Sequence, residues 1–147
     1  MEINSTLTRL DLPGNGIGDS GATALAKEME GNSTLTWLDL SPNKIVDDSG
    51  TAGLAKEVER NVRLTYLDLP SNEVGGSGAA ALTQAMEINS TLAYLDLPDN
   101  KISDSGATAL TKAMERKSTL RYLNLSGNEI GDLGSAAQDK AMDINSR

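Results

Sequence analysis

One nine-residue pattern governs what this chain can fold into, because it returns five times along the sequence. The copy at 92–100 reads LAYLDLPDN, with leucines at its first, fourth and sixth positions and asparagine at its ninth. The other copies are LTRLDLPGN at 7–15, LTWLDLSPN at 35–43, LTYLDLPSN at 64–72 and LRYLNLSGN at 120–128. A repeat of this kind indicates a small structural unit that stacks on its own copies.

The spacing of the copies fixes the length of the unit. Their first leucines are Leu7, Leu35, Leu64, Leu92 and Leu120, so the successive steps are 28, 29, 28 and 28 residues. The one extra residue lies between Ile45 and Leu54, and we expect Asp47 or Asp48 to form a bulge in a surface loop, where insertions cost little. The sequence therefore predicts five units in a single domain covering residues 1–147, without distinct capping segments.

The first half of each unit alternates like a strand. In the copy at 66–69, Leu67 and Leu69 point to one side, whereas Tyr66 and Asp68 point to the other. Alternation over so short a stretch predicts a strand with one buried face.

The second half has helical spacing. Three apolar residues of 105–114 share one helix face, namely Ala107, Leu110 and Met114. We expect Asp104 or Ser105 to supply the N-cap oxygen of this helix. Because a helix connects each pair of strands, successive strands must be parallel.

An asparagine ends every copy where the strand passes into a loop. These residues are Asn15, Asn43, Asn72, Asn100 and Asn128. Their side chains are expected to satisfy backbone groups that no sheet ladder reaches, so they are interpreted as structural residues.

The motif Leu-x-x-Leu-x-Leu-x-x-Asn-x-Ile, followed by a helical segment, resembles the leucine-rich repeats. The 28-residue period is similar to that of the ribonuclease-inhibitor subfamily, which includes the repeat domains of NOD-like receptors and of Ran GTPase-activating proteins. The resemblance implies an α/β fold, a right-handed solenoid of five leucine-rich repeats with parallel strands on the concave face and helices on the convex face. It says little about function, because this fold serves many partners.

Stacked strands place equivalent outward residues in columns. The position before the second leucine forms an aromatic column of Arg9, Trp37, Tyr66, Tyr94 and Tyr122, which holds every aromatic residue of the chain. The position after that leucine forms an acidic column of Asp11, Asp39, Asp68, Asp96 and Asn124. Neighbouring carboxylates about 5 Å apart repel one another by roughly 0.8 kcal/mol even in bulk water.

This combination predicts a partner-binding surface. Tyrosine and tryptophan anchor interfaces, and acidic flanks attract cations. The predicted binding residues are Trp37, Tyr66, Tyr94, Tyr122, Asp11, Asp39, Asp68 and Asp96. A purely structural alternative is that both columns were copied by repeat duplication and that the rings pack across strands to stabilise the sheet.

Composition narrows the classes of function. The chain has no cysteine and no histidine, and its formal net charge is −8, so the predicted partner is a protein with a basic surface rather than nucleic acid or an anionic membrane. No nucleophile–base pair is visible, and no enzymatic activity, metal or cofactor is expected. The N-terminus lacks the basic and apolar regions of a signal peptide, which favours a cytoplasmic location.

Three other features resemble sites for phosphate binding, glycosylation and cation binding, but only weakly. The loop GNGIG at 14–18 resembles a phosphate-binding loop, but it lacks the lysine of a P-loop. The triplets Asn-Ser-Thr at 4–6, 32–34 and 89–91 match the glycosylation pattern, although they are more simply loop residues. The acidic column could hold divalent cations, but evenly spaced single carboxylates rarely converge on one ion.

The ends of the chain leave alternatives open. Residues 1–6, MEINST, repeat residues 86–91, and the chain stops at the same phase of the unit, with Gln138 where Leu110 stands one repeat earlier. A solenoid with uncapped ends exposes core leucines and a strand edge. The chain is therefore expected to form homo-oligomers through its ends as a self-associating structural unit, or to be a fragment of a larger leucine-rich repeat receptor or GTPase-activating protein.

Overall fold

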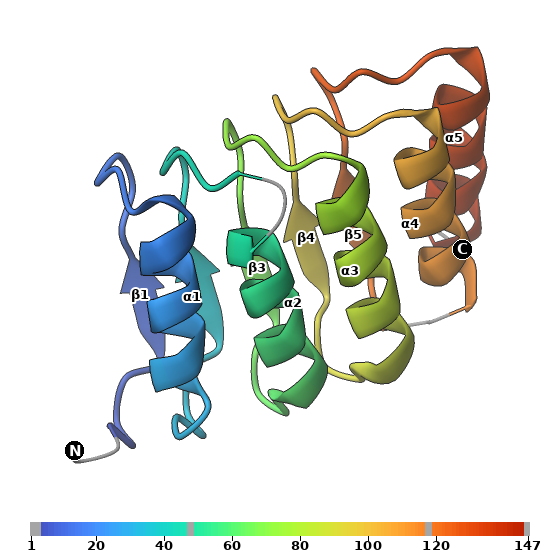
Figure 1. Cartoon of the computed structure of the whole chain (residues 1–147). Helices are drawn as coiled ribbons and strands as arrows, with labels where there is room; N and C mark the ends of the chain where they lie inside the picture. The colour runs from blue at the N-terminus through green and yellow to red at the C-terminus, as the bar shows by residue number, and fades with distance from the viewer. Residues whose placement is uncertain (1–3, 47–48, 117–118, 146–147) are drawn as a thin grey trace.

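The computed structural model describes residues 4–46, 49–116 and 119–145, with side chains described through residue 140. In these residues five strands alternate with five helices (Figure 1). Their order is β1 (Arg9–Asp11), α1 (Gly18–Met29), β2 (Trp37–Asp39), α2 (Ser49–Arg60), β3 (Tyr66–Asp68), α3 (Gly76–Ile88), β4 (Tyr94–Asp96), α4 (Asp104–Arg116), β5 (Tyr122–Asn124) and α5 (Asp132–Asn145). The bulge expected at Asp47 or Asp48 lies outside the described residues.

The strands form one parallel sheet in the order β1-β2-β3-β4-β5, so every strand lies beside its neighbours in the sequence. The helices form a second layer that runs along the sheet from the first repeat to the last (Figure 1). This two-layer repeat is the α/β solenoid that the sequence predicts, and that prediction is confirmed. The outer surface of the sheet, on the side away from the helices, is called the strand face below.

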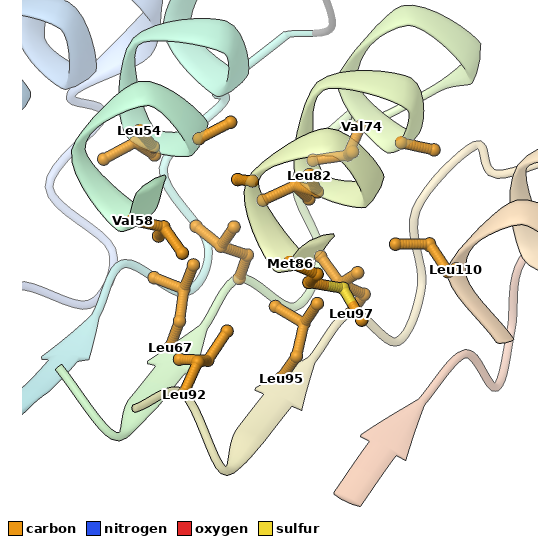
Figure 2. Packing of buried hydrophobic residues seen from close by; sticks show 14 of the residues in the cluster. Leu54, Val58, Leu67, Val74, Leu82, Met86, Leu92, Leu95, Leu97 and Leu110 are labelled. Carbon is orange, nitrogen blue, oxygen red and sulfur yellow. The ribbon is translucent and has the colours of Figure 1, made fainter. Parts of the chain in front are cut away.

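The core fills the space between the sheet and the helices. Leucines of the strands, such as Leu67 and Leu95, are buried and face Leu82 and Met86 of α3 (Figure 2). The helical face predicted for α4 is also buried, because Ala107, Leu110 and Met114 are at most 1% exposed. Each helix thus covers the leucines of the sheet with its apolar side.

In the second to fifth repeats, the asparagine that ends the strand motif links neighbouring repeats. Asn100, for example, accepts a hydrogen bond from the N–H of Val74 in the preceding repeat (3.0 Å) through its side-chain oxygen. Its amide nitrogen donates to the carbonyl oxygens of Leu69 (3.0 Å) and Leu97 (3.2 Å). The structural interpretation is confirmed for Asn43, Asn72, Asn100 and Asn128, since they satisfy backbone groups beyond the short strands, whereas the amide nitrogen of the exposed Asn15 bonds to Pro13 of its own loop.

The expected N-cap of the fourth helix is wrong. Helix α4 already begins at Asp104, and Oδ1 of Asp104 accepts hydrogen bonds from Gly131 N (2.8 Å) and Gly134 N (2.9 Å) of the following repeat. Asp104 therefore caps the start of α5 rather than that of its own helix. The pairing of repeats in space, which a single helix cannot reveal, decides which helix the carboxylate serves.

Candidate partner-binding face

Three-residue strands place the two columns side by side on the strand face. The central leucines, Leu10, Leu38, Leu67, Leu95 and Leu123, are in register across the sheet and point toward the helices. The residue before and the residue after each leucine therefore point outward together. The structure brings all eight predicted site residues onto this one surface, in the register that the sequence predicts.

The rings of the aromatic column stack without a break across four strands. The centroids of Trp37 and Tyr66 lie 3.4 Å apart with an interplanar angle of 4°. The next two pairs are more open, at 5.6 Å for Tyr66 and Tyr94 and 5.3 Å for Tyr94 and Tyr122. Tyr94 and Tyr122 are exposed, whereas Trp37 and Tyr66 are half-buried, so the open end of the ring surface lies at β4 and β5.

Arg9 of β1 completes this stack. Its guanidinium carbon lies 4.1 Å from the ring centroid of Trp37, which is cation–π geometry. Its Nε donates to Oδ2 of Asp11 at 2.6 Å. The chain thus contains one guanidinium held between a ring of the aromatic column and a carboxylate of the acidic column.

The acidic column is most strained electrostatically at its centre. Partial burial, together with the neighbouring charges of Asp39 and Asp96, raises the pKa of Asp68 to about 6. Burial also raises the pKa of Asp96, and a hydrogen bond from Asn124 partly opposes that shift. At neutral pH Asp68 is therefore mostly charged, and a cation that approaches it would be favoured.

Some polar atoms of the two columns lack partners within the described part of the chain. Oδ1 of Asp68 and Oδ1 of Asp96 are buried and accept no hydrogen bond there, and Nε1 of Trp37 donates none. By contrast, Oδ1 of Asp39 accepts from both the N–H (2.9 Å) and the hydroxyl (2.6 Å) of Ser41. Because both oxygens are buried, they cannot meet a partner's donor in this arrangement, but their unpaired charge makes the middle of the acidic column the place where a nearby cation would be most favourable.

The phenol groups of Tyr66 and Tyr122 stay protonated at neutral pH, because their surroundings raise the pKa of each. Burial raises the pKa of Tyr66, and the nearby carboxylates of Asp68, Asp96 and Asp39 raise it further. Burial and the charge of Asp96 likewise raise the pKa of Tyr122. The face therefore combines neutral rings with a line of negative charge, which suits a basic, amphipathic group.

The ring geometry also fits the structural alternative. Stacked rings on adjacent strands stabilise a sheet by some tenths of a kcal/mol per pair. Packing across strands and binding of a partner are compatible, since stacking holds the rings in one orientation before any contact forms. The use of these eight residues in binding remains a prediction.

Sequence reasoning missed a second set of structural asparagines at the opposite end of the strands. The side-chain oxygen of Asn89 accepts from the N–H groups of Thr91 and Leu92, and its amide nitrogen donates to the carbonyls of Val58 and Asn61. Two repeats earlier, Asn32 makes the equivalent hydrogen bonds. Their recurrence three residues before the first leucine of a repeat was the available signal. Asn89 is buried, so its Asn-Ser-Thr triplet belongs to the fold.

The glycine-rich loop at 14–18 also has a structural role. Gly14, Gly16 and Gly18 all have positive φ angles, which favour glycine in tight turns. Ser71 and Asp99, at the position of Gly14 in later repeats, adopt the same sign of φ. Gly14 therefore matches the backbone of the repeated loop, and Lys44, at the position of Gly16 in the second repeat, also has a positive φ, so these two glycines need no phosphate ligand to explain them.

Within residues 4–46, 49–116 and 119–145, no group of three or more acidic side chains is arranged to hold a metal ion. Among the described helices, none is both long and apolar enough to span a membrane.

A family model described as Leucine Rich repeat matches the chain in five segments, residues 4–26, 31–55, 60–82, 89–110 and 116–137. Each segment contains one copy of the motif that forms a strand in the structure. The chain belongs to the leucine-rich repeat family. Leucine-rich repeat domains are protein–protein interaction modules, and no enzymatic family is indicated by the match.

Solved structures of leucine-rich repeat proteins share the architecture. Leiomodin-1 actin-binding site 2 has a TM-score of 0.76 at 17% identity, covering 97% of this chain and 83% of that one. The tropomodulin C-terminal domain of Caenorhabditis elegans has a TM-score of 0.75 at 14% identity, covering 98% and 87%. Internalin C2 of Listeria monocytogenes has a TM-score of 0.50 at 26% identity, covering 88% and 56%. At these identities the first two likenesses show the fold alone. No curated protein matches the chain.

Proposed function

We propose that this chain is a non-enzymatic binding module that takes a basic protein surface against its strand face, the expected concave side of the solenoid. The partner would present arginine side chains, which stack on the aromatic column and pair with the acidic column. The eight predicted residues would form the contact, with Tyr94, Asp68 and Asp96 at its centre.

The observation that carries this proposal is the environment of Arg9. One guanidinium stacks on Trp37 and bonds to Asp11 at the edge of the sheet. Further along the same face, Tyr94 and Tyr122 are exposed, and Asp68 and Asp96 each have one buried oxygen, Oδ1, without a partner among the described residues. A partner's guanidinium groups would stack on these exposed rings and pair with the neighbouring carboxylates, as Arg9 stacks on Trp37 and pairs with Asp11 at β1. Arginine suits such a site better than lysine, because its planar group can stack and bond at once.

Five finer predictions accompany this proposal. The 28-residue period supports membership of the ribonuclease-inhibitor-like subfamily, and the unbroken sheet supports one domain over residues 1–147. We also propose a cytoplasmic location, no nucleic-acid or membrane partner, and association of copies through their ends.

The test measures binding of a nine-residue arginine peptide and a nine-residue lysine peptide by the fluorescence of Trp37, the only tryptophan of the chain. The decisive variant is Asp39→Asn/Asp68→Asn/Asp96→Asn, which keeps the shapes of the side chains and removes three charges. The matched control is Glu28→Gln/Glu59→Gln/Glu115→Gln, which removes three charges from the helices.

We expect the arginine peptide to bind more tightly than the lysine peptide. The aspartate variant should weaken that binding by about tenfold or more, equivalent to about 1.4 kcal/mol, and the glutamate control should change it by less than about twofold. Equal losses in the two variants would mean that net charge alone attracts the peptide, and the strand face would then be abandoned as the site.

Binding of actin to the unmodified chain and to the aspartate variant is measured as well, with actin as a protein probe. The name of the leiomodin-1 structure identifies an actin-binding site, and the two chains share their fold at 17% identity. Binding of actin that depends on the three aspartates would assign the partner, whereas binding that is indifferent to them would place actin on another surface.

A further inference from the structure

The first repeat presents an incompletely covered apolar edge. Leu7 is 37% exposed, whereas its equivalents in the other four repeats are at most 3% exposed. Leu7, Leu10, Leu25 and Met29 line a cavity of about 140 Å³ at this edge. In the second, third and fourth repeats the corresponding side chains are all buried. We call this surface, from β1 to α1, the N-edge.

The fifth repeat presents the complementary surface, the C-edge, from β5 to α5. Ser135 is exposed there, although its equivalents Ala22, Thr51, Ala79 and Ala107 are fully buried against the following repeat. Ile130 is partly buried, whereas the equivalent Ile102 is fully buried. The C-edge therefore exposes positions that the chain elsewhere covers with its next repeat.

The hydrogen bonds between repeats indicate which donor and acceptor groups would pair if these edges were joined. At each internal junction the motif asparagine of one repeat donates to a leucine carbonyl of the repeat before it, as Asn43 does to Leu12 (2.8 Å) and Asn128 does to Leu97 (2.8 Å). On the N-edge, Asn15 is exposed and its amide nitrogen donates only to Pro13 of its own loop among the described residues. The carbonyl of Leu125 holds the matching acceptor position on the C-edge.

The two columns also fit across such a junction. In the register of the sheet, β1 beside β5 of a second copy would place Arg9 next to Tyr122 and Asp11 next to Asn124. Arg9 already stacks on Trp37 at 4.1 Å, so it would lie between two rings. The acidic column changes from aspartate to neutral asparagine at the strand where a further Asp–Asp repulsion would otherwise arise.

We propose that the N-edge of one copy docks on the C-edge of a second copy, so that the solenoid continues from molecule to molecule. This inference deepens the predicted association through the chain ends and is independent of the basic partner. The contact is heterologous, which produces open-ended chains of molecules rather than closed dimers unless a ring forms.

Two features keep this contact weaker than an internal junction. Asp139 is exposed at the position of Ala26 and Ala55, which are buried between helices, so α5 contributes less apolar surface. The net charge of −8 per copy also opposes assembly, and salt screens that repulsion. We therefore expect reversible assembly that strengthens as ionic strength rises.

The test is sedimentation equilibrium of the chain alone, without peptide, from about 5 to 500 μM at low and high salt. The average mass should rise with concentration beyond that of a dimer. Asn15→Lys blocks the N-edge and Ser135→Arg blocks the C-edge, and both residues are exposed. Gln84→Lys is the control, because it adds the same charge on α3 at the position that is lysine in α1, α2 and α4.

Each blocked variant alone should stay monomeric, the control should assemble like the unmodified chain, and an equimolar mixture of the two blocked variants should form a 1:1 dimer through their intact edges. Circular dichroism checks that each variant is folded. If one fails to fold, Arg9→Ala should weaken assembly by about 3- to 30-fold, and Asp139→Ala should strengthen it. A monomeric unmodified chain, or a monomeric mixture, overturns the proposal. Loss of assembly in Asn15→Lys but not in Ser135→Arg would indicate symmetric pairing of two N-edges and would also overturn it.

Discussion

Asn72 lies at the middle of the repeat array, and its replacement by alanine should be among the most damaging changes in the chain. The side chain is 5% exposed. Its oxygen accepts from the N–H groups of Asn43 (2.9 Å) and Ile45 (3.0 Å), and its amide nitrogen donates to three carbonyls, those of Leu40, Leu69 and Pro70. One side chain thus satisfies backbone groups of two repeats.

The expected cost follows from the groups left without partners. Asn72→Ala removes the acceptor of two N–H groups, and a donor left unsatisfied in a buried site costs about 1–3 kcal/mol. Two such donors give a loss of about 4 kcal/mol in the free energy of unfolding. A domain of ordinary stability has about 5–15 kcal/mol in total, so the variant should remain folded in water but with a much lower midpoint of urea unfolding.

Asn15→Ala is the matched control for this prediction. Asn15 occupies the same motif position in the first repeat, but it is exposed and its amide nitrogen reaches only Pro13 of its own loop (3.1 Å). Its replacement should cost about 0.5 kcal/mol or less. Urea unfolding followed by circular dichroism, with an unchanged m-value, would report both effects. If the two variants differ by less than about 1 kcal/mol, the bonds between repeats do not carry the stability assigned to them.

Three further substitutions test individual side chains. The raised pKa of Asp68, about 6 against an ordinary 3.8, means that the folded chain holds an extra proton between these values. Stability should therefore fall as pH rises from 4 to 6, and Asp68→Asn should reduce this fall in thermal melts. Glu57→Ala should raise the free energy of unfolding by about 1 kcal/mol in urea, because Glu57 is 4% exposed with one unpaired oxygen and later repeats have alanine there. Asp104→Ala should cost about 1 kcal/mol and speed amide exchange at the start of α5; unchanged exchange would remove its capping role.

The environment of the buried Glu57 carboxyl group could not be predicted in full from the alignment of the repeats. Its equivalents in the third and fourth repeats are Ala85 and Ala113, which are 1% exposed. Burial raises the pKa of Glu57, with the charge of Glu30 acting in the same sense, and a long hydrogen bond from Asn61 (3.5 Å) and the charge of Arg60 oppose it. The alignment of repeats identifies the position as buried, but the absence of a good partner appears only when α2 is packed against α1.

The sequence by itself determined the architecture and the composition of the strand face. Leucines that alternate over three residues and then recur with helical spacing allow little other than a stacked strand–helix unit, because each face must be buried by a neighbouring copy. Register follows from the repeat, since equivalent residues must stack, and it places Trp37 beside Tyr66 and Asp39 beside Asp68 without reference to coordinates.

Only the tertiary structure decided how neighbouring repeats use their polar groups. The capping of α5 by Asp104, the bonds of Asn89 to the preceding repeat and the guanidinium of Arg9 over Trp37 all join residues from different repeats. Their existence depends on distances of a few ångströms, which a residue pattern does not specify. The raised pKa of Asp68 has the same origin, since it depends on how deeply the sheet buries the carboxyl group and how near Asp39 and Asp96 lie.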